Sequence, residues 1–427
     1  MNTLHMCLML SAAPGGQQDW TDLFNGRDLA GWVNVNGADS TWRAEDGMIR
    51  CTGIPTCLLR TDQQYENFVL EFEWMHHKAQ GNAGIFVWSD ALPAPGVPFS
   101  KSIEVQVMIG VETANYTSEG DIFSIWGATM TPDRPHPGGW ARCLPSEART
   151  KGAGEWNHYR IVCNDGRVTL AVNGKVVSGA YDCNPRKGYI CLESEGTPID
   201  FRNLRLQELP VANSPWAIDA NDATGFMPLF NGLNLDGWKL PEGNESNWTR
   251  SGTHITHNGK GGNLWTDESF GDFDLVIDWK WSGDSQGLMD RPVIGPDGSA
   301  TTNEDGTPQT TNIEEYDSGI YLRGNSKSQI NLWNWSVGSG ELWGYRTDPS
   351  MSDDIRAAVT PSAKADNAIG QWNRFFIRMR GDRVTVVLNG VTVIEDAMLP
   401  DVPAQGPIGL QSHGSGVTFS NILIRKR

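Results

Sequence analysis

The stretch DRVTVVLNGVTVIE, residues Asp382–Glu395, decides the fold class. Apolar residues alternate along it on both sides of Asn389-Gly390, which is the period of a strand with one buried face. Asn-Gly is the preferred two-residue connection of a β-hairpin, because both central positions need a positive φ. An earlier stretch, RVTLAVNGKVV (Arg167–Val177), has the same form around Asn173-Gly174. The sequence therefore predicts two equivalent antiparallel hairpins.

These hairpins belong to a repeat that runs through the whole chain. The matched pairs are LFNGRDLAGW (Leu23–Trp32) with LFNGLNLDGW (Leu229–Trp238), YENFVLEFEW (Tyr65–Trp74) with FGDFDLVIDW (Phe270–Trp279), NAGIFVW (Asn82–Trp88) with DSGIYLR (Asp317–Arg323), and GYICLESEGTPIDFRNLRLQEL (Gly188–Leu209) with GPIGLQSHGSGVTFSNILIRKR (Gly406–Arg427). We predict a leader at 1–18, a first domain at 19–209, a linker at 210–224 and a second domain at 225–427. An insertion rich in Gly, Asp and Thr, roughly 284–312, is expected to be a surface loop of the second domain.

Each copy reads as an all-β domain. The stretches NFVLEFEW (67–74) and DFDLVIDW (272–279) also alternate with period two, and no long helical period occurs. Many short strands in about 190 to 200 residues indicate an antiparallel sandwich. The last strand of each copy should pair near the first strand of the same copy, because domain termini tend to lie close together.

Composition narrows the class of protein. The formal net charge is −17, which argues against nonspecific binding to nucleic acid or to an anionic membrane. No apolar run is long enough to span a bilayer. The chain has 18 Trp against 8 Tyr. Single Trp residues usually fill β-sandwich cores, but an indole face also stacks on a pyranose ring.

Two features favour export to a secreted or periplasmic location. LHMCLMLSAA (4–13) is a short apolar segment followed by small residues, as in a signal peptide, although no Lys or Arg precedes it. Six cysteines, at 51, 57, 143, 163, 183 and 191, all fall in the first copy. An even number confined to one domain favours disulfides over a zinc site, and the pairing cannot be read from spacing.

The combined motifs resemble the 3-keto-disaccharide hydrolase domain family. They are LFNG-x-x-L-x-G-W, N/D-x-G-I, G-x-W-N, N-G and L-x-S-x-G followed by F-x-N, and they cover nearly all of both copies. The resemblance implies two tandem concanavalin A-like jelly-roll β-sandwiches. It also implies a substrate that is a glycoside oxidised to a ketone at C3 by a partner oxidoreductase.

Such a substrate suits hydrolysis or β-elimination rather than ordinary glycosidase chemistry. The C3 ketone makes the C2 proton acidic, and the resulting enolate expels the substituent at C1. The site needs a general base, a group that stabilises the ketone oxygen and an acid for the leaving group. A divalent metal could stabilise the enolate, and jelly rolls of this type often carry calcium, so a metal is expected without named ligands.

In the first copy, SIEVQVM places Glu104 and Gln106 on one face of a strand, opposite Ile103 and Val105. The resemblance carries a Glu-x-Gln pattern here, and we take Glu104 and Gln106 as candidate catalytic groups, with Glu104 as the base. The further candidates for substrate binding in this copy are Asp121, Trp126, Glu193 and Glu195.

The second copy changes the ionisable groups in the same frame. Gln329 stands in place of Glu104, Asn331 in place of Gln106, and His413 in place of Glu195. His413 is a candidate catalytic base because histidine titrates near neutral pH. The remaining candidates for substrate binding are Arg323, Gln329, Glu341, Trp343 and Arg346.

Three interpretations stay open at this point. The chain is an exported enzyme acting on 3-keto-glycosides, a noncatalytic lectin-like pair of glycan-binding modules, or a structural cell-surface protein. The fold is compatible with each of them. The amidated position 329 favours at least one noncatalytic copy, and the sequence does not say which copy is catalytic.

Overall fold

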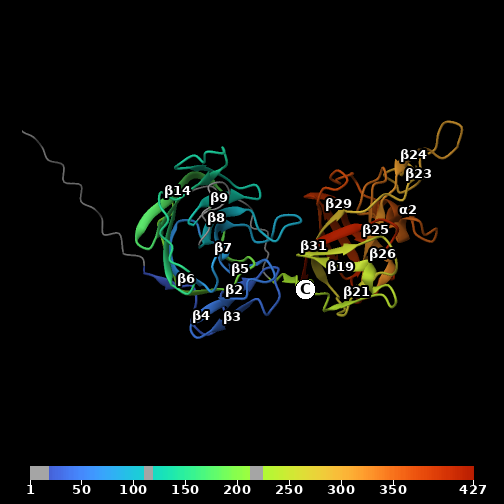
Figure 1. Cartoon of the computed structure of the whole chain (residues 1–427). Helices are drawn as coiled ribbons and strands as arrows, with labels where there is room; N and C mark the ends of the chain where they lie inside the picture. The colour runs from blue at the N-terminus through green and yellow to red at the C-terminus, as the bar shows by residue number, and fades with distance from the viewer. Residues whose placement is uncertain (1–18, 110–118, 212–224) are drawn as a thin grey trace, which may run out of the picture.

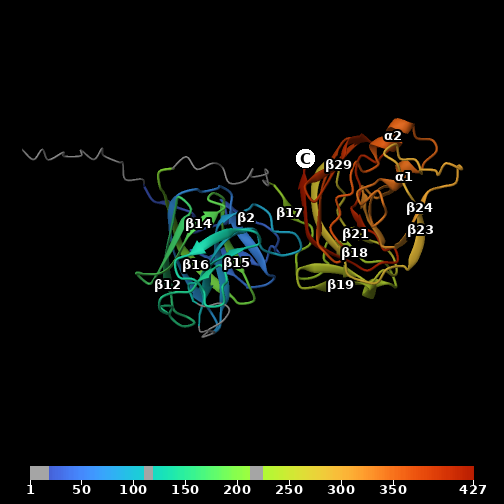
Figure 2. The same cartoon turned by 90° about the horizontal axis from the view of Figure 1, so that it is seen from above.

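The computed structural model describes residues 19–109, 119–211 and 225–427. The predicted leader at 1–18 and most of the predicted linker therefore lie outside the described residues. The described chain forms two β-sandwiches that lie side by side, as Figure 1 and the view from above in Figure 2 show. All strand pairings between named strands are antiparallel, so the prediction of two concanavalin A-like jelly rolls is confirmed.

The first sandwich packs two large sheets against each other. The larger sheet has the order β10 (Thr129–Pro132), β14 (Lys175–Asn184), β13 (Arg167–Val172), β12 (Asn157–Asn164), β6 (Phe68–His76), β16 (Ile199–Glu208), β4 (Met48–Cys51), β3 (Trp42–Glu45), with β1 (Thr21–Asp22) paired to β16. The smaller sheet has the order β11 (Arg142–Cys143), β9 (Ile122–Ile125), β8 (Ser102–Met108), β7 (Asn82–Ser89), β15 (Tyr189–Ser194), β5 (Cys57–Thr61), β2 (Trp32–Asn34).

The second sandwich repeats this plan with a shorter second sheet. Its larger sheet has the order β19 (Trp248–Ser251), β20 (His254–His257), β31 (Val417–Lys426), β22 (Phe273–Trp281), β27 (Asn373–Arg380), β28 (Arg383–Leu388), β29 (Val391–Met398), with β17 (Met227–Pro228) paired to β31. Its smaller sheet has the order β18 (Trp238–Lys239), β21 (Leu264–Thr266), β30 (Gly409–Leu410), β25 (Asp317–Leu322), β26 (Asn325–Trp333). Short helices are η1 (Glu245–Asn247), α1 (Trp343–Arg346) and α2 (Asp353–Ala358).

The local predictions hold where the pattern was strong. Asn389 and Gly390 have φ of 50° and 83° and connect β28 to β29, as the Asn-Gly hairpin requires. The last strand of each copy pairs with the first, β16 with β1 and β31 with β17. The insertion in the second domain is more ordered than predicted, because it contains a hairpin of β23 (Leu288–Pro292) and β24 (Thr310–Glu314).

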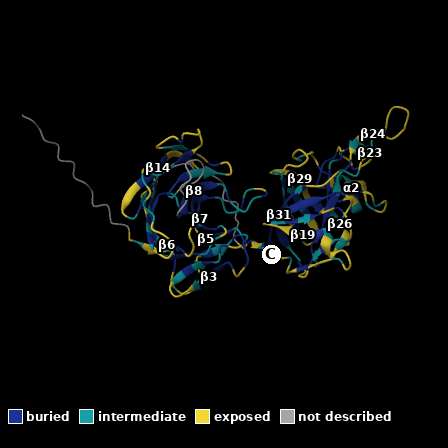
Figure 3. Ribbon diagram, viewed as in Figure 1, coloured by how far each residue is buried: buried dark blue, intermediate teal, exposed yellow. Residues whose placement is uncertain are grey.

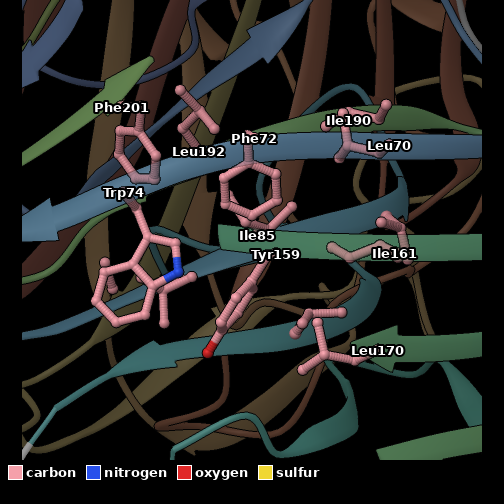
Figure 4. Close-up of a cluster of buried hydrophobic side chains, with 14 of the residues drawn as sticks. Leu70, Phe72, Trp74, Ile85, Tyr159, Ile161, Leu170, Ile190, Leu192 and Phe201 are labelled. Carbon is pink, nitrogen blue, oxygen red and sulfur yellow. The ribbon is translucent and has the colours of Figure 1, made fainter. Parts of the chain in front are cut away.

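A separate apolar core fills each sandwich, and Figure 3 shows the burial concentrated between the sheets. Figure 4 shows the core of the first sandwich, where Trp74 and Tyr159 meet edge to face with ring centroids 5.3 Å apart. Trp74 and its repeat partner Trp279 are both fully buried, so these two Trp residues fill cores rather than bind sugar.

The expectation of disulfides is wrong for this structure. All six described cysteines are buried free thiols. No helix in the described part of the chain is long and apolar enough to cross a membrane.

Candidate functional site

A cavity of about 320 Å³ lies on the smaller sheet of the first domain, on the face turned away from the core. Its lining residues come from the five adjacent strands β11, β9, β8, β7 and β15 and from the loops beside them: Asn82, Phe99, Glu104, Gln106, Phe123, Ile125, Trp126, Arg142, Glu193 and Glu195. Five of the six residues proposed from the first copy therefore line one cavity. They are the candidate base Glu104, with Gln106, Trp126, Glu193 and Glu195.

Strand alternation puts the polar groups there. Ile103 and Val105 point into the core, so Glu104 and Gln106 face the other way, as predicted. In the register of the sheet, Gln106 lies opposite Gly84 and Glu104 lies opposite Phe86. Loops cover this face, so that Glu104 is only 6% exposed.

Gly84 makes room for two carboxyl groups on this face. A Cβ atom built on Gly84 would lie 2.7 Å from Glu104 Oε1 and 2.7 Å from Glu193 Oε2. Real Cβ atoms do not approach oxygen that closely, so any larger residue would push the carboxyl groups away. Glu193 Oε2 is buried and has no hydrogen-bond partner among the described residues. The sheet thus holds a polar atom in position for a ligand or a proton.

Burial and mutual repulsion keep protons on this cluster. Burial, followed by the charge of Glu195, raises the pKa of Glu104 well above its usual value. Burial, followed by the charges of Glu104 and Glu195, does the same to the pKa of Glu193. Burial raises the pKa of Glu195 to about 7, against the lowering effect of its hydrogen bond from Asn82. Carboxyl groups this close cannot all ionise, so near neutral pH they share protons.

One cation lies beside the carboxyl groups. The Arg142 guanidinium group lies over the Phe123 ring, with Cζ 4.1 Å from the centroid, and its charge lowers the pKa of Glu104. Arg142 Nη1 is 3.5 Å from Asp121 Oδ2, and Asp121 is fully buried. Asp121 therefore orients Arg142 and does not itself line the cavity. The prediction that Asp121 contacts substrate is not supported by this position.

Gln106 is fixed by its neighbours. Its Nε2 donates to Asn82 Oδ1 and to the Ala83 carbonyl, the latter at 3.0 Å. Asn82 in turn donates to Glu195. Gln106 therefore belongs to the scaffold that positions Glu195, and no proton-transfer role follows from its chemistry.

The rim of the cavity offers aromatic surface. Trp126 is 49% exposed and lines the cavity next to Ile125. Phe99 lies between β7 and β8, and its ring packs edge to face on Phe86 with ring centroids 6.0 Å apart. An exposed indole at a polar cavity is the arrangement that stacks on a sugar ring.

The strand register of the second domain confirms how the two copies align. The equivalent positions carry different side chains. Gln329 lies opposite Tyr321, and Asn331 lies opposite Gly319, just as Glu104 and Gln106 lie opposite Phe86 and Gly84. Gln329 Nε2 donates to Gln411 Oε1 at 2.9 Å. Gln329 and Gln411 thus stand where the first domain has Glu104 and Glu193.

His413 likewise takes the place of Glu195. Its Nδ1 lies 3.1 Å from Asp317 Oδ2, as Glu195 pairs with Asn82 in the first domain. The hydrogen bond with Asp317 raises the pKa of His413. His413 belongs to a different sheet and a different domain from Glu104, so the three predicted catalytic residues do not form one site.

The other candidates in the second domain separate into three places. Glu341 and Arg346 form a buried ion pair, and Asn331 Nδ2 reaches Glu341 Oε2 at 3.5 Å. Trp343 is 49% exposed on helix α1. Arg323 is not on this face, because it donates to the carbonyls of residues 271, 381 and 403 and pairs with Asp272. It stands in place of Trp88 of the first copy, whose indole likewise donates to a backbone carbonyl, that of Glu66.

The expected metal has no clear ligand set. Among the described residues, no group of three His, Cys, Asp or Glu side chains is arranged so that it could hold a metal ion. Among the carboxyl groups of the cavity, Glu195 accepts a hydrogen bond from Asn82. We therefore derive no chemical step through a metal, and the expectation of calcium stays a prediction.

Sequence reasoning missed five lining residues of this cavity, which are Asn82, Phe99, Phe123, Ile125 and Arg142. Asn82 stood in the repeated N-A-G-I motif and could have been found by asking which residue neighbours Glu195. Arg142 and Phe99 lie in segments without a counterpart in the second copy, and nothing local in the sequence marks them.

Comparisons with known proteins agree with the resemblance. The family described as "3-keto-alpha-glucoside-1,2-lyase-like domain" matches residues 19–207 and again 225–425. A search of curated proteins found no match. A "putative glycosyl hydrolase" from Parabacteroides distasonis is 24% identical, with a TM-score of 0.35, over 45% of this chain and 94% of that one.

Two further solved structures resemble the chain less. The carbohydrate-binding module CBM66 from Bacillus subtilis is 15% identical, with a TM-score of 0.32, over 44% of this chain and 100% of the module. A β-glucanase from Bacillus licheniformis is 12% identical, with a TM-score of 0.30, over 46% of this chain and 100% of that one. The family match spans both sandwiches, and the chain belongs to the 3-keto-alpha-glucoside-1,2-lyase-like domain family, with two copies of the domain.

Proposed function

We propose that the first domain cleaves 3-keto-glycosides by removing the C2 proton. The observation that carries this proposal is the crowding of Glu104 and Glu193 over Gly84, with Glu195 and Arg142 beside them in one cavity. Near neutral pH this cluster holds at least one protonated and one ionised carboxyl group. Such a pair supplies both an acid and a base.

Glu195 is the best candidate for the base. With a pKa of about 7 it is partly ionised at neutral pH, and its basicity is matched to that pH. It accepts the C2 proton, and the C2–H electron pair forms the enolate with the C3 carbonyl. The hydrogen bond from Asn82 orients the carboxylate.

Glu104 is better suited to the acid than to the base expected from the sequence, because burial raises its pKa well above the usual value and so favours the protonated form. It gives its proton to the C1 oxygen as the enolate expels the leaving group. The product of this elimination is an enone. Hydrolysis is completed when water adds to C1 and a proton returns to C2.

Arg142 and Trp126 fit the remaining tasks. The guanidinium group at the cavity wall supplies the positive charge that stabilises the enolate oxygen. Trp126 offers its exposed ring to the apolar face of the sugar.

The test is incubation of the full chain with p-nitrophenyl 3-keto-α-glucoside, with and without EDTA, following released nitrophenol. We expect release by the native protein, a loss of at least about 100-fold in Glu104→Gln and Glu195→Gln, and no loss in Glu155→Gln, an exposed control. No release by the native protein, or full activity in both variants, would refute the proposed site. Loss with EDTA would establish a metal requirement.

A second function is proposed for the second domain. Its equivalent face carries the amides of Gln329, Asn331 and Gln411, and Trp265 stacks on Tyr321 with ring centroids 5.2 Å apart. Amides and aromatic rings recognise neutral sugars without supplying an acid or a base. We propose that this domain binds glycan without cleaving it. Calorimetric titration of the Glu104→Gln protein with neutral oligosaccharides tests this, since a Trp265→Ala variant should lose the binding.

Two further expectations belong to this proposal. The protein is exported, and an oxidoreductase supplies the 3-keto sugar. Fractionation of producing cells tests the first, and a requirement for prior C3 oxidation of the glycoside tests the second.

A further inference from the structure

The loop between β7 and β8 of the first domain connects the candidate cavity to the second domain. It is the sequence ALPAPGVPFS, residues Ala91–Ser100, which we call the β7–β8 loop. In Figures 1 and 2 it reaches from the first sandwich across to the second. The corresponding connection in the second domain, between β25 and β26, is only two residues long, so the loop is peculiar to the first copy.

The backbone of the loop forms hydrogen bonds with side chains on the larger sheet of the second domain. Gly96 N donates to Asp278 Oδ2 at 2.9 Å, and Gly96 O lies 3.0 Å from His254 Nε2. Arg374 Nη2 donates to the Pro93 carbonyl at 2.7 Å. Asn421 Nδ2 donates to the carbonyls of residues 94 and 97 at 3.1 Å and 3.0 Å.

These contacts are built into the second domain. Asp278 is fully buried and accepts from Arg374 and Asn421 as well as from Gly96. The equivalent position in the first domain, Glu73, is instead closed by Arg202 from its own sheet. Ser420 of the second domain stands where the first has Arg202, and the smaller residue leaves space for the loop.

Gly96 fits against an aromatic ring. A Cβ atom on Gly96 would lie 2.1 Å from the Trp372 indole, and its φ is 76°. Both the ring and the left-handed backbone therefore require glycine at the tip.

The base of the same loop is a wall of the cavity. Phe99 lines the cavity, and its carbonyl accepts from Ala94 N at 2.8 Å. Ala94 is one of the residues whose carbonyl Asn421 holds. On the other side, Asn36 Nδ2 donates to the Pro98 carbonyl at 2.9 Å. Prolines at 93, 95 and 98 fix φ at three positions, so the short loop transmits a displacement of its tip to Phe99.

We propose that the second domain is a positioning element for the site in the first: by holding the β7–β8 loop at Asp278, Asn421 and Trp372, it sets the place of Phe99 and hence which leaving groups the cavity admits. This inference rests on the proposed function only for the identity of the leaving group. The mechanical part, that the second domain fixes a wall of the cavity, stands without it. It gives the second copy a role that needs no catalytic groups, in keeping with the replacement of Glu104, Glu193 and Glu195 by Gln329, Gln411 and His413.

The test compares Gly96→Ala with Gly26→Ala in the full chain. Gly26 also has φ of 76°, but nothing lies within 4 Å of its Cβ position, so the control carries the same backbone strain without the collision. Amide hydrogen exchange of the peptides that cover residues 91–100 and 121–127 reads the two cavity walls. Turnover of p-nitrophenyl and methyl 3-keto-α-glucosides reads selectivity.

We expect Gly96→Ala to exchange at least 10-fold faster in both peptides and to change the ratio of kcat/KM values for the two glucosides by about 5-fold or more. Gly26→Ala should change neither. Unchanged exchange in Gly96→Ala, or faster exchange at 91–100 with unchanged exchange at 121–127, would overturn the inference.

The two proposals fail separately. If no 3-keto-glycoside is turned over by the native protein, the proposed function falls, and the exchange of residues 121–127 still decides whether the second domain fixes the cavity wall. If turnover is present but its selectivity is the same in Gly96→Ala, the function stands and the positioning role falls.

Discussion

Replacing Glu195 by glutamine should stabilise the first domain above neutral pH while it removes the proposed base. The side chain is partly buried, and this burial raises its pKa from the usual 4.5 to about 7. Glutamine keeps an oxygen that accepts the Asn82 hydrogen bond but has no charge to bury. The variant therefore separates the electrostatic cost of this carboxylate from its shape.

The sign of the effect follows from the two pKa values. Below pH 4.5 the carboxyl group is protonated in the folded and in the unfolded chain, and its contribution to stability is intact. Between pH 4.5 and about 7 the unfolded chain releases the proton first, so the free energy of unfolding falls as pH rises. Above about pH 7 both states are ionised and the loss is complete. With about 1.4 kcal/mol for each pKa unit, the loss amounts to about 3 kcal/mol.

Urea denaturation at pH 4.5 and pH 8, followed by tryptophan fluorescence, measures this difference. We expect Glu195→Gln to be about 3 kcal/mol more stable than the native protein at pH 8 and nearly equal to it at pH 4.5. The exposed control Glu155→Gln should follow the native protein at both values. If Glu195→Gln loses the same stability between the two pH values as the native protein, Glu195 is not the strained carboxyl group that the cavity geometry implies.

Three other predictions concern the same cavity. Gly84→Ala should lower kcat/KM more than 10-fold, because its Cβ would collide with Glu104 and Glu193, whereas Gly319→Ala in the second domain should leave turnover unchanged; steady-state kinetics of the two variants decide this. Trp126→Ala should raise KM about 10-fold while the unfolding free energy stays within about 0.5 kcal/mol, because the indole is half exposed; equal KM values would show that the ring does not stack on substrate. Arg142→Met should cost about 3 kcal/mol, since it takes the cationic partner from the buried Asp121 carboxylate; thermal unfolding measures the loss, and a change below 1 kcal/mol would contradict the pairing.

The sequence by itself determined the repeat, the strands and the hairpins. Alternation around Asn173-Gly174 and Asn389-Gly390 is a local pattern, and a one-residue shift would turn every apolar side chain to the wrong face. The same alternation placed Glu104 and Gln106 outside the core and aligned them correctly with Gln329 and Asn331.

The tertiary structure alone decided which polar groups meet and in which protonation state. Arg142 on β11 and Phe99 in the β7–β8 loop come from segments that the repeat does not contain, so no motif could bring them to Glu104. In our proposal Glu104 acts as the acid rather than as the expected base, because burial raises its pKa well above the usual value. Arg323 does not lie at the predicted site, because its side chain donates to backbone carbonyls that are far from it in the sequence. The hydrogen bonds that hold the β7–β8 loop could not be predicted either. The loop contributes only backbone groups, which every sequence has, and the packing of the two domains brings them to the side chains of Asp278, Arg374 and Asn421.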